Sequence, residues 1–100
     1  MIKGTTPTHT FEVDIDTDSI KEVKVTYSQQ DKVIVEKRTE ECDITQGKIQ
    51  TKLKQEETFK FDHSVLVYAQ LRILTINGDV LATDLIMLPV SKCLDEEVLI

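Results

Sequence analysis

The fold is decided by one stretch, Val65-Leu-Val-Tyr-Ala-Gln-Leu-Arg-Ile-Leu-Thr-Ile-Asn-Gly-Asp-Val-Leu-Ala-Thr-Asp-Leu-Ile-Met-Leu-Pro-Val90. Two long apolar runs meet here at Asn77-Gly78, and Asn-Gly between such runs is the strongest short-range signal for a β-hairpin. The runs are rich in Val, Ile, Leu and Tyr and lack helical spacing. They therefore predict two antiparallel strands.

The loop length fixes which residues of this hairpin share a face. A two-residue loop would set Leu71 opposite Asp84 and bury a carboxylate beside a core leucine. A three-residue loop, Ile76 to Gly78 with its glycine in the left-handed region, pairs Thr75 with Asp79 and removes that conflict. We predict the longer loop, which places Asp84 opposite Gln70 on the outer face. The core face then holds Val67, Ala69, Leu71, Ile73, Leu81, Leu85 and Met87.

The opposite face of the hairpin is unusually apolar. Its only polar or charged residues are Gln70, Arg72 and Asp84, whereas a solvated sheet face is mostly polar. Contiguous apolar patches mark contact surfaces. We expect a contact with another chain there, or a cover formed by the chain's own tail or by Gln55–Phe61. The tail, Ser91–Ile100, has four aliphatic residues and is expected to pack on a neighbouring chain unless it is unordered. The candidate interface residues are Leu66, Tyr68, Leu74, Val80, Ile86, Leu88, Leu94 and Leu99.

Upstream of the hairpin, Val, Ile, Thr, Phe and Tyr alternate with polar residues at period two, as in half-buried strands. The first three strands read as a meander, and Gln55–Thr58 reads as one helical turn that crosses between two sheets. One hundred residues supply one core. We predict a single all-β domain over residues 1–100, an antiparallel β-sandwich of about seven strands. The upstream strands are expected at Thr8–Asp16, Ile20–Ser28, Lys32–Arg38, Cys42–Thr45 and Lys48–Lys54.

Composition and charge argue against a nucleic-acid or membrane partner. The net charge is −6, Trp is absent, and the longest basic run is Lys37-Arg38, so the sequence shows no clustered positive charge for a phosphate backbone. No apolar run reaches the ~20 residues of a membrane span, and the first residues do not resemble a secretory signal. Without export, Cys42 and Cys93 are expected to be reduced rather than bridged.

One acidic turn has the spacing of a cation site. Asp14, Asp16 and Asp18 follow the one-three-five pattern of a calcium loop, but Ser19 and Val25 stand where that loop needs Gly and a bidentate Glu. A solvated acidic turn is the favoured interpretation.

No motif in the sequence predicts catalysis. Cys42 lies between Glu41 and Asp43, whose charges raise the pKa of a thiol and oppose a reactive thiolate. His9 and His63 lack the further ligands of a zinc site, and His9 is expected on an apolar strand face with one ring nitrogen hydrogen-bonded. We predict no enzyme activity, no cofactor and no metal.

Several segments resemble a known group of proteins. Met1-Ile-Lys-Gly-Thr-Thr-Pro-Thr-His-Thr-Phe11, the turn Asp16–Ile20, Lys52-Leu-Lys-Gln-Glu-Glu-Thr58 and Leu71-Arg-Ile-Leu-Thr-Ile-Asn-Gly-Asp79 are similar to small proteins encoded in phages and prophages of Gram-positive bacteria. The likeness extends more loosely to the immunoglobulin-like sandwich domains of phage baseplate proteins.

This resemblance implies an immunoglobulin-like sandwich and a structural or assembly role in a phage tail or baseplate. It implies protein partners, a homo-oligomer, and synthesis in the host cytoplasm, followed by a place in the virion or a role in assembly alone. No site residues transfer from it. The alternative is a small module that binds carbohydrate or another cell-surface ligand through its loops, but Trp is absent and Tyr27 and Tyr68 both lie in predicted strands.

Overall fold

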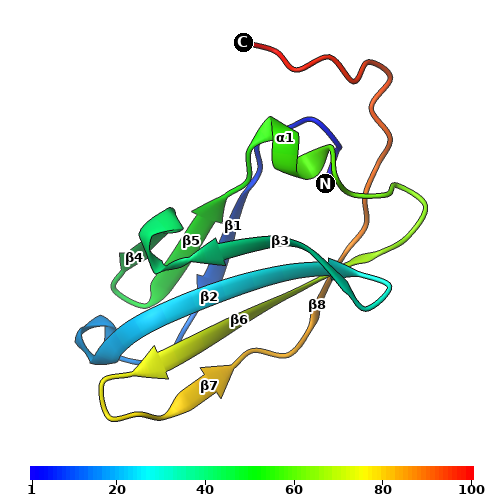
Figure 1. Ribbon diagram of the computed structural model, residues 1–100. Coiled ribbons are helices and arrows are strands. Elements are labelled where there is room, and N and C mark those ends of the chain that lie inside the picture. The colour runs from blue at the N-terminus through cyan, green and yellow to red at the C-terminus, as the bar shows by residue number, and fades with distance from the viewer.

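The computed structural model describes residues 1–100 and contains two antiparallel sheets that face each other, as Figure 1 shows. The all-β prediction is confirmed, with eight strands in place of about seven because the last predicted strand is divided. The strands are β1 (Thr8–Glu12), β2 (Ile20–Gln29), β3 (Lys32–Arg38), β4 (Cys42–Thr45), β5 (Lys48–Lys52), β6 (Val67–Thr75), β7 (Val80–Ala82) and β8 (Ile86–Leu88). A helical turn, α1 (Gln55–Thr58), and two 3-10 turns, Thr17–Ser19 and Thr39–Glu41, complete the elements.

The order of the strands in the two sheets is the same as that of strands B to G in an immunoglobulin sandwich. One sheet has the order β1-β5-β4, and the other has the order β3-β2-β6 with β7 and β8 both paired to β6. If β1 is taken as strand B, these are the orders B-E-D and C′-C-F-G. The only trace of a preceding strand is one parallel bridge between Ile2 and Ser91.

The expected meander of the first three strands is wrong. Strand β1 pairs with β5, in the sheet opposite β2 and β3. Alternation identifies which face of a strand is buried, and β1 buries that face against β2 across the sandwich instead of pairing beside it. The single helical turn is confirmed, since α1 carries the chain from β5 in the smaller sheet to β6 in the larger one.

The core lies between the sheets and takes side chains from both. Inward positions expected from alternation are confirmed, including Val23, Val25 and Tyr27 on β2. The buried hydrophobic residues are Phe11, Val23, Val25, Tyr27, Val35, Ile49, Leu53, Phe61, Val67, Ala69, Leu71, Ile73 and Val90.

The predicted three-residue loop is confirmed. The N–H of Thr75 donates to the carbonyl oxygen of Asp79 at 2.9 Å, Leu74 pairs with Val80, and Gly78 has φ +89°. Its left-handed conformation is one that glycine adopts without steric cost.

The register slips by one residue farther along this hairpin. Ile73 pairs with Leu81, which would set Val67 opposite Met87, but Val67 pairs with Leu88. The slip follows Thr83, whose Oγ1 accepts from the N–H of Leu71 at 3.1 Å. The hydroxyl of Thr83 accepts the hydrogen bond that its own backbone carbonyl would accept in a regular ladder. One residue is thereby added on this side of the hairpin, and the side chains of the strand that follows point to the opposite faces.

The slip corrects several sequence predictions. Leu85 and Met87 are exposed instead of buried. Ile86 and Leu88 turn to the core side opposite Ala69 and Val67, where Leu88 packs against the core. Asp84 is outside the ladder, and the side chain of Gln70 donates to the carbonyl of Thr83 instead. Leu81 keeps the expected register but lies at the sandwich edge, 42% exposed.

Candidate interaction surface

Large apolar side chains are exposed along the β7–β8 edge of the larger sheet. We call this set the β7–β8 surface, and its members are Leu66, Val80, Leu81, Leu85, Ile86 and Met87. Because all six side chains are exposed, neither the tail nor the α1 crossover covers them, and the expected internal cover is wrong.

Two members of the surface face the core side of the sheet. Leu81 is opposite Ile73, and Ile86 is opposite Ala69, yet they are 42% and 40% exposed. A groove of about 230 Å³ that is lined by Leu81 also reaches Leu71 and Ile73. In an immunoglobulin sandwich the first strand covers the side of the domain next to strands B and G. No strand of the described chain lies on this side, which is open to solvent.

The eight candidate interface residues separate into four groups. Leu66, Val80 and Ile86 belong to the β7–β8 surface, while Tyr68 and Leu74 are half-buried. Leu88 packs against the core and is withdrawn from the set. The tail residues Leu94 and Leu99 are exposed.

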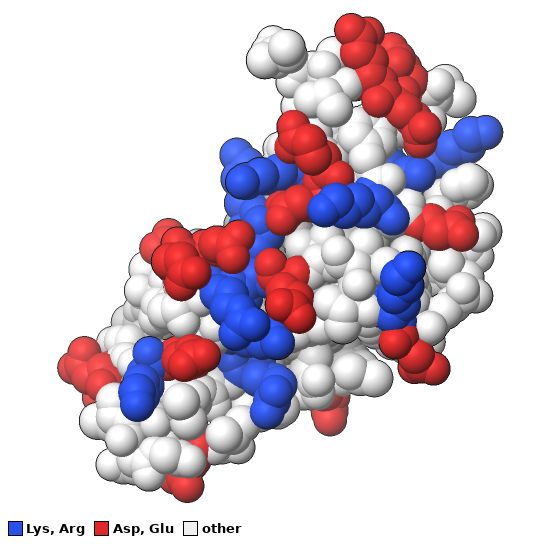
Figure 2. Space-filling view, viewed as in Figure 1, with Lys and Arg blue, Asp and Glu red and all other residues white.

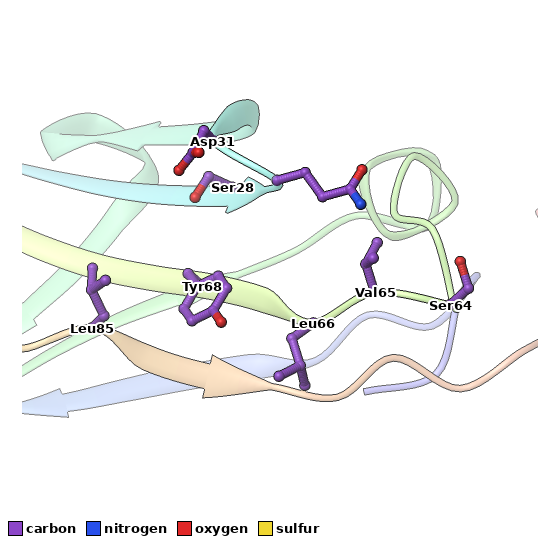
Figure 3. A pocket seen from close by; sticks show the side chains of 8 residues that line it. Ser28, Asp31, Ser64, Val65, Leu66, Tyr68 and Leu85 are labelled. Atoms are coloured by element: carbon purple, nitrogen blue, oxygen red, sulfur yellow. The ribbon is translucent and has the colours of Figure 1, made fainter.

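A second groove, of about 680 Å³, adjoins the surface (Figure 3). The apolar part of its lining is Val65, Leu66, Tyr68 and Leu85, and the polar part comes mainly from the β2–β3 turn and from Ser64. This lining offers apolar contact together with a few hydroxyl, amide and carboxylate hydrogen-bonding groups.

The tail runs past α1, away from the β7 end of the molecule (Figure 1). Its backbone is held at Leu99, whose N–H donates to Oε1 of Gln55 at 2.9 Å and whose carbonyl accepts from Nε2 of Gln55 at 2.6 Å. Nζ of Lys3 lies 3.3 Å from Oε1 of Glu96. The aliphatic side chains contribute little to this attachment, since Leu94 is 99% exposed.

His9 lies where alternation places it. Its Nδ1 is 2.7 Å from the hydroxyl of Tyr27 on the facing sheet. Burial raises the pKa of Tyr27, so the hydroxyl keeps its proton and shares one hydrogen bond with the imidazole. Burial, together with the charge of the N-terminal ammonium, lowers the pKa of His9. The neutral imidazole thus links the two sheets.

A buried lysine was not expected from the sequence. Lys37 is 2% exposed, and its Nζ lies 2.6 Å from Oε1 of Glu57 and 3.7 Å from Oε2 of Glu41. Burial opposes ionisation of Glu57, but hydrogen bonds from Lys37 and from the N–H of Lys54 outweigh it, so its pKa is lowered. Alternation along the strand predicts that Lys37, two residues after the buried Val35, points inward. The carboxylates that pair with it come from distant parts of the sequence and are seen only in the folded structure.

Both cysteines are free thiols. Burial raises the pKa of Cys42 and the charges of Glu41 and Glu40 add to this, against a hydrogen bond with Thr51 and the charge of Lys37. The predicted direction is confirmed, and the thiolate form is disfavoured at neutral pH.

The acidic turn is a helix cap. Oδ1 of Asp16 accepts from the N–H of Asp18 at 3.1 Å, at the start of the 3-10 turn Thr17–Ser19. No three His, Cys, Asp or Glu side chains, those of Asp14, Asp16 and Asp18 included, come together in a way that would hold a metal ion. None of the helices has the length and hydropathy needed to span a bilayer.

The expectation that positive charges do not cluster is wrong. Lys24, Arg38 and Arg72 are far apart in the sequence but occupy one cross-strand row of the larger sheet. Figure 2 shows a band of basic side chains across the middle of this view of the molecule.

Comparison with protein families, with curated proteins and with solved structures found no match.

Proposed function

We propose that this protein is a non-enzymatic structural or assembly component of a phage or prophage particle, associated with its tail or baseplate. It acts through protein–protein contacts, its partners are other components of the particle, and it forms a homo-oligomer. The observation that carries the proposal is the open side of the sandwich, where the core-side residues Leu81 and Ile86 remain exposed.

The exposed side chains there favour association. Burial of apolar surface stabilises a complex by roughly 25 cal/mol per Å², and exposed apolar clusters on folded domains mark contact sites. Val80 and Met87 extend the apolar surface beyond the open side.

The backbone of β7 is also available for pairing. Asp79 and Thr83 direct their hydrogen bonds to Thr75 and Leu71 of β6. Because such bonds alternate along an antiparallel strand, the N–H and C=O groups of Val80 and Ala82 point away from the sheet. A strand from a partner would pair there and cover the open side in the same step.

The assignment to a phage particle rests on the resemblance of the sequence. Genes for a tail tape measure protein, a baseplate protein or a holin beside this gene would support it, and an isolated operon for secreted proteins would contradict it. A carbohydrate-binding module remains the second candidate, but the grooves contain no Trp, and Tyr68 is the single aromatic residue in the larger one.

Ile86→Lys tests the contact, with Val33→Lys as the matched control. Val33 is a β-branched residue on the opposite edge of the same sheet and is 50% exposed. At both positions the lysine head group reaches solvent, so the melting temperature changes little. We expect Ile86→Lys to abolish self-association measured by light scattering and Val33→Lys to preserve it. Equal association of both variants would contradict the proposal.

A further inference from the structure

Three positive charges stand side by side on the outer face of the larger sheet. Lys24 of β2 is directly opposite Arg38 of β3 on one side and Arg72 of β6 on the other. Neighbouring strands are about 4.8 Å apart, so the row spans roughly 10 Å. Like charges directly opposite each other destabilise a sheet. Such a row in a chain of net charge −6 is therefore unfavourable without an anionic partner.

The chain neutralises this basic row only in part. Glu36 lies 3.4 Å from Nζ of Lys24 and 3.6 Å from Nη2 of Arg38. Arg72 is exposed and is in no ion pair. A groove of about 250 Å³ runs beside the row and is also lined by Leu74, Val80 and the carboxylate of Glu22. Glu22 is in no ion pair with the row, so the site offers the unpaired guanidinium of Arg72 next to a recess whose lining is half apolar.

We infer that the basic row is the docking site for the segment Leu94–Ile100 of a second copy of this chain. The segment carries three carboxylates, Asp95, Glu96 and Glu97, among four aliphatic residues. Its negative charge is complementary to the positive charge of the row, and its aliphatic side chains suit the apolar part of the recess. In an extended strand Asp95 and Glu97 project from one side about 7 Å apart. That separation lies within the span of the three cations.

The occupant is a second copy because the chain's own segment is directed elsewhere. It runs away from β7 (Figure 1) and is tied at Leu99 to Gln55 of α1. Its one ion pair joins Lys3, whose side chain is 14% exposed, to Glu96, which is 63% exposed, and a pair with one partner in solvent contributes only about 1 kcal/mol. Release of the segment therefore costs little.

The contact joins two different surfaces, the tail of one copy and the sheet face of the next. Such a heterologous contact leaves each copy with one free tail or one free face, and it closes into a ring or grows into a filament. The inference rests on the proposed function, for which it names the partner and the geometry of assembly.

Charge reversals in the full-length protein test the docking by sedimentation velocity at several protein concentrations. Arg72→Glu and Glu97→Lys should each raise the dissociation constant for self-association by about tenfold or more. The two reversals together in one chain restore the opposite-charge contact between copies and should recover association. Lys32→Glu, the same charge change at an exposed site outside the row, should leave association unchanged.

Several outcomes would overturn the docking. If Arg72→Glu leaves association unchanged while Ile86→Lys abolishes it, the docking is wrong and the proposed function stands. If the wild-type protein stays monomeric at every concentration, both are wrong. If the basic row instead binds a single-stranded oligonucleotide, with binding lost in Arg72→Glu and self-association unaffected, its partner is nucleic acid and the docking is again wrong.

Discussion

Nζ of Lys37 lies 2.6 Å from Oε1 of Glu57, and this ion pair joins the edge strand of the larger sheet to the helical turn that leaves the smaller one. The lysine is 2% exposed, and the glutamate side chain is 18% exposed. A buried charge left without its partner strongly destabilises a fold. The pair therefore ties the crossover to β3.

Glu57→Gln tests the pair, with Glu56→Gln as its control. The glutamine can still accept from the N–H of Lys54, as Glu57 does at 2.8 Å, but leaves Lys37 with only Glu41, at 3.7 Å. We expect a loss of about 3 kcal/mol in the free energy of unfolding, measured by urea denaturation. Glu56 is exposed and in no ion pair, so Glu56→Gln should change little. Equal stabilities would show that Lys37 does not need Glu57.

His9 should make stability depend on pH. Its pKa in the folded protein is lowered from 6.5, so the unfolded chain binds more protons, and stability is lost as the pH falls from about 6.5 through the folded pKa. In thermal melts between pH 7.5 and 5, His9→Gln should flatten this slope. His63→Gln should retain it, because His63 is exposed. A slope that depends on His63 instead would contradict this role for His9.

The register slip predicts different costs at two positions that alternation alone treats as equal. Leu71 is fully buried and Met87 is 61% exposed. Leu71→Ala should cost about 2–5 kcal/mol, whereas Met87→Ala should stay within about 0.5 kcal/mol of the wild type. Chemical denaturation of the two variants measures both values. Comparable losses would mean that the strand keeps one register to its end.

Removal of the tail should separate assembly from folding. Deletion of Leu94–Ile100 removes one ion pair with Lys3 and hydrogen bonds with Gln55 and Cys93, and no residue of the core, so the melting temperature should change little. Self-association should weaken, because the deletion removes the segment assigned to the basic row. A large drop in melting temperature would place the tail in the fold, and unchanged association would remove it from the contact.

Local chemistry predicts the hairpin and much of the core. Each of three features is determined by residues that are close together in the sequence. They are the Asn77-Gly78 loop, the inward residues of β2 and the helical turn at Gln55. Those elements agree with the structure because no distant contact is needed to form them.

The parts that depend on distant pairing could not be predicted. The hydroxyl of Thr83 shifts the register only because Leu71 is beside it. The basic row needs the pairing of β2 with β6 and also the bulge beside Ser28, which skips Ile34 and brings Arg38 opposite Lys24. No spacing along the chain encodes these alignments, and the exposure of the candidate surface follows from them.

The molar mass of the wild-type protein, measured by light scattering on a size-exclusion column over a wide range of concentrations, tests the central claim most directly. The account predicts association, with a mass above that of the 11.4 kDa chain, because an open sandwich side and a basic row are both available for contact. A strict monomer at every concentration would contradict it.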